Sequence, residues 1–225
     1  MLRLTYYGHA AFLLNDGKFS VIIDPFLEGN PVAQVKPADV KADYVVVTHA
    51  HGDHLGDAIP IAQRCNATII AVNELAEYVA SKGAKAHNMH IGGAVTLPFG
   101  RVKLTIAHHG SVTPDGVYGG SPAGALITMD GKTVYHTGDT GLFYDMKLIG
   151  ESQPVDVMLC PIGDNYTMGL EDAVKSVELV RPRLAVPMHY NTWPVIAADP
   201  NEFVRRVSAT GFNGKMMKVG ESLEL

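Results

Sequence analysis

Residues 48–54 read THAHGDH and directly follow the run 43–48, DYVVVT. That β-branched run predicts a strand buried on both faces, which ends where the histidines begin. Three imidazoles and a carboxylate within six residues are the donors that hold zinc and similar divalent cations. In extended backbone His49 and His51 point to one face and can bind one ion, and the bend at Gly52 turns the later donors towards a second. The segment predicts a metal site, and a His-rich polar loop is the alternative.

Two metals need more donors than this segment holds, and the other candidates also follow predicted strands. They are the pair His108-His109, Asp139 and His189. In α/β sheets, sites gather at the carboxyl ends of strands, so donors that repeatedly occupy this position are expected to meet. Adjacent residues of a strand point to opposite faces. We therefore expect only one of His108 and His109 to reach the metals.

The composition predicts a large buried core. The 225 residues are 47% hydrophobic and 18% charged, which excludes a disordered or fibrous protein. A net charge of -5, with the basic residues scattered, argues against nucleic-acid binding. A small phosphorylated substrate stays compatible, because bound cations would reverse the local field.

The cysteines and the apolar runs indicate a cytoplasmic protein. Cys65 and Cys160 form no C-x-x-C pair, so we expect buried reduced thiols and no disulfide. Residues 1–15 lack the architecture of a signal peptide. No apolar run approaches the ~20 residues that span a bilayer, so we expect no contact with a membrane.

Periodicity and turn residues predict that each half of the chain is β-rich first and alternates strand and helix afterwards. Strands are expected over residues 2–7, 11–14, 18–23, 43–48, 67–72, 94–98, 102–107, 123–129, 133–136, 155–160 and 184–187. Helices are expected over residues 55–65, from the cap Asn73 to about Lys82, 170–180 and 200–209, with a surface loop at 110–122. This order predicts an α/β (α+β) protein, a four-layer αββα sandwich that forms a single domain over residues 1–225.

Several strings of the chain resemble the metallo-β-lactamase superfamily. They are THAHGDH, AHHGS, YHTGDTG, PMHYNTW, YYGHAAF, IIDPFLEGNP and PIGDNYTMG, which together span nearly the whole chain. The HxHxDH pattern alone is typical of the superfamily. The other strings are similar to its small prokaryotic metal-dependent hydrolases, a branch related to ascorbate-phosphate lactonase. The resemblance implies the metallo-β-lactamase fold.

The resemblance also implies a pair of divalent cations. One would be held by His49, His51 and His109, the other by Asp53, His54 and His189, with Asp139 as a bridge. His109 is preferred to His108 because the Gly-Ser that follows it matches the family position. We expect zinc, and imidazole and carboxylate donors also accept manganese, iron or nickel.

Three residues are expected to take part in catalysis. Asp53 would hold a metal and pass a proton to the leaving group. His9 in GHAAF and His136 in YHTGD lie where they would contact substrate or orient a ligand. For both histidines, a core hydrogen bond is the alternative. Asp24, which precedes a proline, either bonds a metal-binding histidine or caps the turn.

Other polar and aromatic residues are weaker candidates. Asn165, Tyr166 and Asn191 would line the pocket, with an exposed loop position as the alternative. His87 and His90 are expected at the surface. Trp193 is expected to pack, and its nearness to His189 leaves a recognition role open.

A dinuclear centre of this kind would hold a metal-bound hydroxide as the nucleophile. We expect a metal-dependent hydrolase that cleaves a small ester, lactone or phosphoester. The alternatives are a phosphodiesterase or nuclease acting on nucleic acid, and a metal or redox sensor without hydrolytic turnover. A nucleophile elbow and a P-loop are both absent. The expected partner is a small-molecule substrate, and a homo-oligomer is compatible with the composition.

Overall fold

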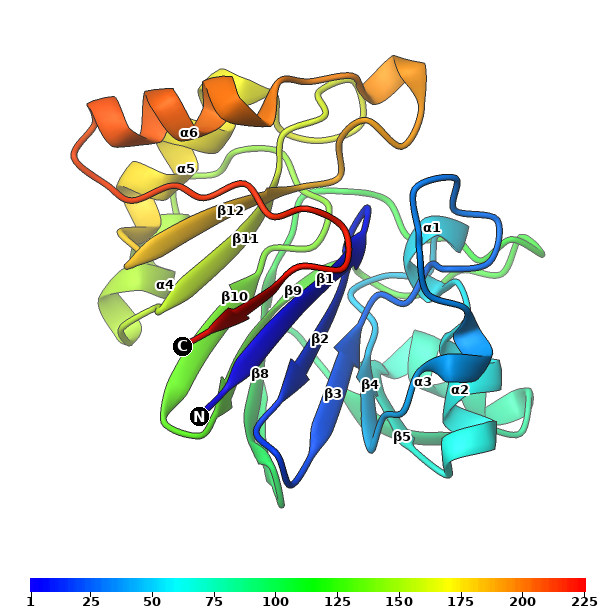
Figure 1. Cartoon of the computed structure of the whole chain (residues 1–225). Helices are drawn as coiled ribbons and strands as arrows, with labels where there is room; N and C mark the ends of the chain where they lie inside the picture. Colours follow the sequence, from blue (N-terminus) through cyan, green and yellow to red (C-terminus); the bar gives the residue numbers. More distant parts are fainter.

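The computed structural model describes residues 1–225 and contains two mixed sheets packed face to face (Figure 1). The first sheet has the strand order β13-β1-β2-β3-β4-β5-β6. Its strands are β1 (Arg3–Gly8), β2 (Ala11–Asn15), β3 (Ser20–Ile23), β4 (Tyr44–Val46), β5 (Thr68–Val72), β6 (Lys85–Met89) and β13 (Ser222–Glu224). Strands β3 to β6 are parallel to one another, and the other neighbours are antiparallel.

The second sheet has the order β12-β11-β10-β9-β8-β7. Its strands are β7 (Ala94–Leu97), β8 (Gly100–Ile106), β9 (Ala123–Met129), β10 (Lys132–His136), β11 (Val157–Pro161) and β12 (Leu184–Met188). Strands β10, β11 and β12 are parallel. Their carboxyl ends therefore lie at the same edge of the sheet.

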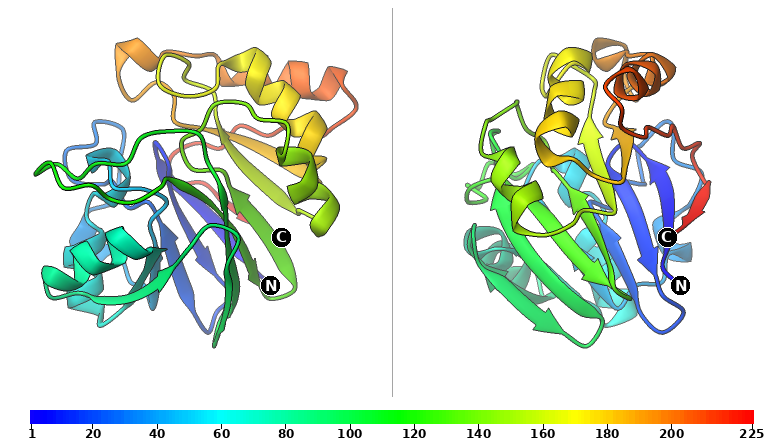
Figure 2. Two further views of the ribbon diagram at one scale, coloured as in Figure 1. Left: turned by 180° about the vertical axis from the view of Figure 1, so that it is seen from behind. Right: turned by 90° about the vertical axis from the view of Figure 1, so that its left-hand side faces the viewer.

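Helices cover the outer faces and complete the αββα layers (Figure 2). Beside the first sheet lie η1 (Pro37–Asp39), α1 (Gly52–Leu55), α2 (Ala58–Cys65) and α3 (Asn73–Ser81). Beside the second sheet lie α4 (Met146–Ser152), α5 (Leu170–Val180), η2 (Pro194–Ile196) and α6 (Pro200–Ala209). No helix combines the length and the apolar character needed to cross a bilayer.

The main hydrophobic core lies between the two sheets. Phe12 and Ile69 of the first sheet belong to the same buried cluster as Val134 and Val157 of the second. A smaller cluster fills the space between the second sheet and α4, α5 and α6, with Tyr135, Met158 and Phe203 among its members. Apolar residues on both faces of the central strands explain why these strands appear in the sequence as continuous apolar runs.

The structure confirms the helices expected at 170–180 and 200–209 and corrects others. The helix expected over 55–65 is two helices, α1 and α2, divided at Gly56. Asn73 is the first residue of α3 rather than its cap, and Val72 holds the cap position. Strand 43–48 is shorter than expected, because its last residues already turn into the histidine segment.

Besides the two short 3-10 helices η1 and η2, the strands β6 and β13 and the helix α4 were not expected from the sequence. Strand β6 is an edge strand of polar composition, KAHNM, with little alternation of apolar residues. Strand β13 has three residues, and α4 has no side-chain cap. Each forms because a neighbouring element pairs with it or packs on it. Local sequence patterns do not reveal such contacts with distant segments.

Gly56 brings two functional segments into close contact. Its φ of +38° lies in the left-handed region, and a Cβ atom there would lie 2.6 Å from the carbonyl oxygen of Pro25 and 2.7 Å from Cα of Phe26. Only glycine permits the chain after α1 to approach the segment that follows β3 so closely.

Replacing Gly56 by alanine is expected to lower the free energy of unfolding by about 2–4 kcal/mol, because the methyl group meets backbone atoms. Gly17→Ala is the matched control: Gly17 has a φ of +89° but nothing within 4 Å of a Cβ, so its cost is the backbone term of about 1 kcal/mol. Urea unfolding measures both. Equal losses in the two variants would contradict the importance of this contact.

Candidate metal centre

Four strand ends deliver the predicted metal donors to one place. The segment after β4 carries the HxHxDH residues, the end of β8 leads to His109, β10 to Asp139, and β12 to His189. Asp139 lies between segments far apart in the sequence: its Oδ2 is 3.0 Å from Nε2 of His189, and its Oδ1 is 3.2 Å from Nε2 of His54. The expected convergence of the strand ends is present.

The first group of donors is His49, His51 and His109, whose ligand atoms lie within 4.8 Å of one another. Nε2 of His49 is 3.0 Å from Nδ1 of His51, and the His109 ring centroid is 5.1 Å from both of their rings. His49 is buried, whereas His51 and His109 are partly exposed. This group is open to solvent on one side.

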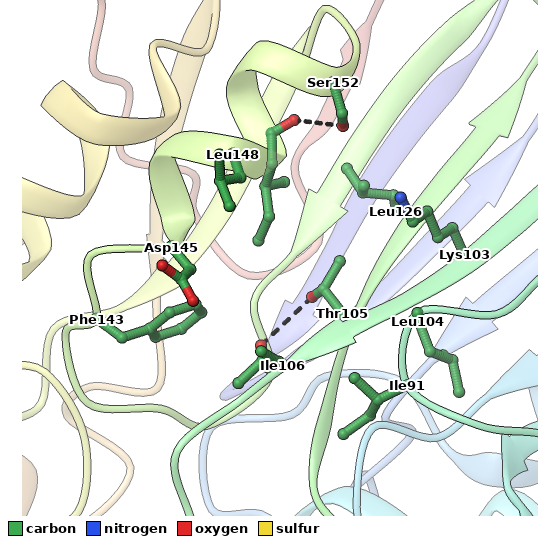
Figure 3. A pocket seen from close by; sticks show the side chains of 12 residues that line it. Ile91, Lys103, Leu104, Thr105, Ile106, Leu126, Phe143, Asp145, Leu148 and Ser152 are labelled. Carbon is green, nitrogen blue, oxygen red and sulfur yellow. Dashed lines mark hydrogen bonds between the residues drawn. The ribbon is translucent and has the colours of Figure 1, made fainter.

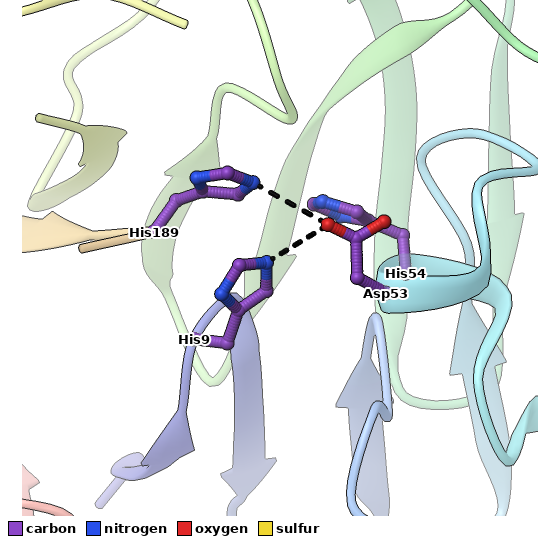
Figure 4. Close-up of side chains that lie close together, drawn as sticks. All are labelled: His9, Asp53, His54 and His189. Atoms are coloured by element: carbon purple, nitrogen blue, oxygen red, sulfur yellow. Dashed lines mark hydrogen bonds and ion pairs between the residues drawn. The ribbon is translucent and has the colours of Figure 1, made fainter. Parts of the chain in front are cut away.

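The second group is His9, Asp53, His54 and His189, again with ligand atoms within 4.8 Å (Figure 4). Asp53 lies between imidazoles, with its Oδ2 3.2 Å from Nε2 of His9 and 3.6 Å from Nε2 of His189. His49, His54 and Asp139 form a third set within the same distance. That set joins the first group to the second.

The buried polar atoms of the centre fit a bound cation. Nε2 of His54, Oδ1 of Asp139 and both ring nitrogens of His189 are buried and have no hydrogen-bond partner, although other donors lie close by. Buried polar atoms are rarely left unpaired, and imidazole and carboxylate are suitable ligands for divalent metals. The donor set therefore fits a metal ion.

The charges at the centre favour replacement of the proton on His189 by a metal cation. Burial alone would raise the pKa of Asp139, but His189 and His54 outweigh it and hold the pKa well below its usual range. Burial would lower the pKa of His189, but Asp139 and Asp53 outweigh it and raise the pKa to about 9. In the metal-free protein a proton on His189 balances the carboxylates. A cation would replace that proton, so metal binding would release protons.

Asp24 orients His54, which supports the hydrogen-bonding role over the turn-capping one. The buried carboxylate accepts hydrogen bonds from Nδ1 of His54 (2.7 Å) and from both N and Oγ1 of Thr48 (2.8 and 2.6 Å). With Nδ1 engaged, Nε2 of His54 is directed at Asp139. A carboxylate behind a metal-binding histidine fixes its tautomer and ring orientation in this way.

His9 is held between Thr192 and Asp53. Burial lowers the pKa of His9 to about 4, so the ring is neutral and carries one proton. The nearby His189 and His9 side chains outweigh burial and hold the pKa of Asp53 far below its usual range. Asp53 is therefore a carboxylate, and the proton of His9 lies on Nε2 and is donated to it. Nδ1 then accepts a hydrogen bond from the Thr192 hydroxyl at 2.7 Å. Thr192 was not among the sequence candidates.

The hydrogen bonds of His136 go to the backbone, and its Nε2 lies 4.0 Å from Oδ2 of Asp24. Its Nε2 donates to the carbonyl oxygen of Ala10 (2.9 Å), and its Nδ1 accepts from the backbone N–H of Gly138 (3.1 Å). Both nitrogens of this fully buried ring are therefore used by the backbone. The core histidine, the alternative reading of its sequence position, describes it better.

The remaining candidates lie outside the donor groups. His108 is exposed and packs on Phe143, with ring centroids 5.0 Å apart, so His109 is the member of the pair that reaches the centre. Trp193 packs against His9 at 5.1 Å. Asn165, Tyr166 and Asn191 are exposed on loops, His87 lies in β6, and His90 is exposed just after it.

Phe143 also borders an apolar groove of about 350 Å³ that contains no metal donor (Figure 3). The groove lies between α4 and β8, and its walls include Ile106, Leu126 and Leu148. It is separate from the histidine groups.

Three residues at the centre have a left-handed backbone although none is glycine. The φ angles are +57° for His9, +44° for Asp24 and +54° for His189. Such conformations cost about 1–3 kcal/mol each and persist where the surroundings impose them. They direct these side chains at the centre as each strand ends.

Residues 3–189 match the family model described as the Beta-lactamase superfamily domain. A UPF0173 metal-dependent hydrolase of Carboxydothermus hydrogenoformans is 51% identical over 100% of both chains. The chain belongs to the UPF0173 metal-dependent hydrolase family. The UPF0173 protein YtkL of Bacillus subtilis is 49% identical over the full length of both chains.

Solved structures agree with this assignment. Igni18, a metallo hydrolase from the archaeon Ignicoccus hospitalis, aligns with a TM-score of 0.91 at 41% identity over 100% of this chain and 99% of that one. YhfI from Bacillus subtilis, a metallo-β-lactamase fold protein, aligns over 100% of both chains with a TM-score of 0.76 at 15% identity, which bears on the fold alone. This UPF0173 protein is a metal-dependent hydrolase with the metallo-β-lactamase fold.

Asp139→Ala is expected to lower metal affinity by more than about 100-fold, because it removes the carboxylate that joins the two donor groups. Asp145→Ala, at an exposed carboxylate of the same loop, is the matched control and should keep its metal. Elemental analysis of both purified variants measures the metal content. A full metal complement in Asp139→Ala would show that this carboxylate is not a ligand.

Thr192→Val is expected to weaken metal binding by about 10-fold, because His9 loses the hydroxyl that fixes its tautomer and hence its bond to Asp53. Thr192→Ser keeps the hydroxyl and should restore the affinity. Competition with a chelator of known affinity gives the dissociation constants, and melting temperatures monitor folding. The same affinity in both variants would show that the hydroxyl does not matter.

Proposed function

We propose that this UPF0173 hydrolase uses two divalent cations, with zinc as the first expectation, to cleave a small ester, lactone or phosphoester. The observation that carries the proposal is the meeting of two donor groups at Asp139. One group would be His49, His51 and His109, and the other Asp53, His54 and His189. Cations bound there lower the pKa of water towards neutrality and polarise the carbonyl or phosphoryl oxygen of a substrate.

Asp53 is the carboxylate of the centre best placed to move a proton. Its side chain is 24% exposed, whereas Asp139 is 2% exposed. The hydrogen bond from His9 holds Oδ2 of Asp53 in position. We propose that Asp53 would hold a cation, accept the proton that the attacking water loses, and pass that proton to the leaving group. His9 would position Asp53, and His136 would support the backbone near Gly138.

We propose a small substrate over the other functions, because the sequence strings quoted above resemble a branch related to ascorbate-phosphate lactonase. A phosphodiesterase or nuclease acting on nucleic acid is disfavoured by the net charge of -5. A metal or redox sensor is disfavoured because the first group consists of imidazoles alone, whereas oxygen-reactive di-iron sites of this fold use more carboxylates. Manganese, iron or nickel would fit the same donors.

The organisation of the protein is part of the proposal. A core shared between the two sheets supports a single domain over residues 1–225. We also propose that the enzyme acts in the cytoplasm on a small molecule and that it assembles as a homo-oligomer.

The test removes metal from the purified protein with a chelator and then restores zinc, manganese, iron or nickel singly. Hydrolysis of a lactone, an aryl ester and a phosphodiester is expected to disappear on removal and to return at two metal equivalents. The melting temperature should also fall, because ligands of the folded state stabilise it by about 2.7 kcal/mol at 100 times Kd. Unchanged turnover and melting after complete removal would contradict the proposal.

A further inference from the structure

The segments that carry the metal donors contain no lysine or arginine. Neither residue type occurs at 42–63, 104–131, 133–146 or 184–204, although the chain has 18 of them. Lys82, just after α3, lies beside the loop 110–122, but its ammonium pairs with Asp115 at 3.2 Å. These segments therefore offer no basic side chain to an anionic group of a substrate.

Acidic side chains, in contrast, are exposed on the segments that follow β3, β10, β11 and β12. They are Glu28, Asp145, Asp164 and Asp199. Proteins bind phosphate and carboxylate groups chiefly through arginine and lysine. The cations would engage the oxygen at the reacting bond, but a second anionic group farther along the substrate would face these carboxylates. Like charges brought together in this way disfavour binding.

The same loops expose apolar side chains. The structure has nine large apolar side chains that are exposed, of which Met1, Ile106 and Leu148 lie elsewhere. The other six lie on the loops that follow β8, β10, β11 and β12: Val112, Val117, Tyr118, Tyr144, Tyr166 and Val195. The loops after β8, β10 and β12 start at strand ends that supply donors, and the loop after β11 follows a strand that lies parallel to β10 and β12. Figure 1 shows several of these loops at the same end of the molecule.

An aromatic pair stands beside the donors themselves. The Trp193 ring lies 5.1 Å from the ring of His9 and 6.0 Å from that of Phe26, and both aromatic residues are partly exposed. His9 in turn bonds Asp53, the more accessible carboxylate of the centre. A substrate group next to Asp53 would therefore meet apolar rings, which favour alkyl and aryl groups.

We infer that the substrate has no charged group outside the ester or lactone that reacts, and that it carries an alkyl or aryl group which packs on Trp193 and Phe26. The substrate class is an apolar ester or lactone, and a phosphorylated lactone is disfavoured. The inference rests on the proposed hydrolytic function and narrows its substrate. It joins two independent observations, the absence of basic residues and the apolar character of the loops.

The test compares γ-lactones with alkyl side chains of increasing length with lactones of equal size that carry a phosphate or a carboxylate. With the metal-loaded protein, kcat/KM is expected to rise by up to about fourfold per methylene. The anionic lactones are expected to be at least about tenfold poorer than their uncharged partners. Binding of the corresponding five-membered lactams, which resist hydrolysis, is measured by calorimetry and should follow the same order.

Variants test the aromatic pair. Trp193→Ala is expected to raise KM about tenfold for the longest alkyl lactone and to leave the shortest nearly unchanged. Leu148→Ala is the matched control, since Leu148 is an exposed apolar side chain at the groove of Figure 3, which contains no metal donor. Equal effects of Trp193→Ala on short and long lactones would overturn the assignment of Trp193.

The two proposals fail in different ways. If the metal-loaded protein hydrolyses none of the lactones and esters, the hydrolytic proposal fails, while the lactam affinities still decide the preference for uncharged ligands. If the anionic lactones or lactams are preferred to the uncharged ones, the inference is overturned and the hydrolytic proposal stands.

Discussion

The structure depends on one buried carboxylate, Asp139, whose two oxygens each lie close to a different imidazole. His54 comes from the segment after β4 and His189 from the end of β12, and both lie within 3.2 Å of Asp139. Burying a charged group is costly unless an opposite charge balances it. The fold meets this requirement by bringing strand ends of both sheets together at one point. A cation, or a proton in its absence, is the component that makes the arrangement stable.

The sequence predicted the fold and the convergence of the expected donors because both depend on short-range patterns. Continuous apolar runs mark the buried strands, and the donors follow those strands directly, as the positions of Asp139 and His189 illustrate. The alternation of side chains predicted that only one of His108 and His109 would face the centre, and the structure puts His109 there. Such patterns need no knowledge of distant contacts.

What the sequence did not predict is set by distant contacts. Thr192 is an ordinary loop residue until β12 brings it to His9, 183 positions away. His136 was expected to take part in catalysis because it precedes Gly138 and Asp139, but the carbonyl of Ala10 in the other sheet uses its free nitrogen. Strand β6 exists because β5 pairs with it, although its own side chains are polar. In each case the deciding partner is remote in the chain.

The left-handed backbone at His9, Asp24 and His189 implies a trade-off between the stability of the fold and the activity of the site. At each of these positions glycine would relax the main chain, and at His9 and His189 asparagine would tolerate the same angles better than histidine. A lineage selected only for a robust scaffold would drift towards those residues. Retention of the two histidines and the aspartate at these left-handed positions would indicate relatives that are still catalytically active. These positions would therefore distinguish active members of the family from inactive ones.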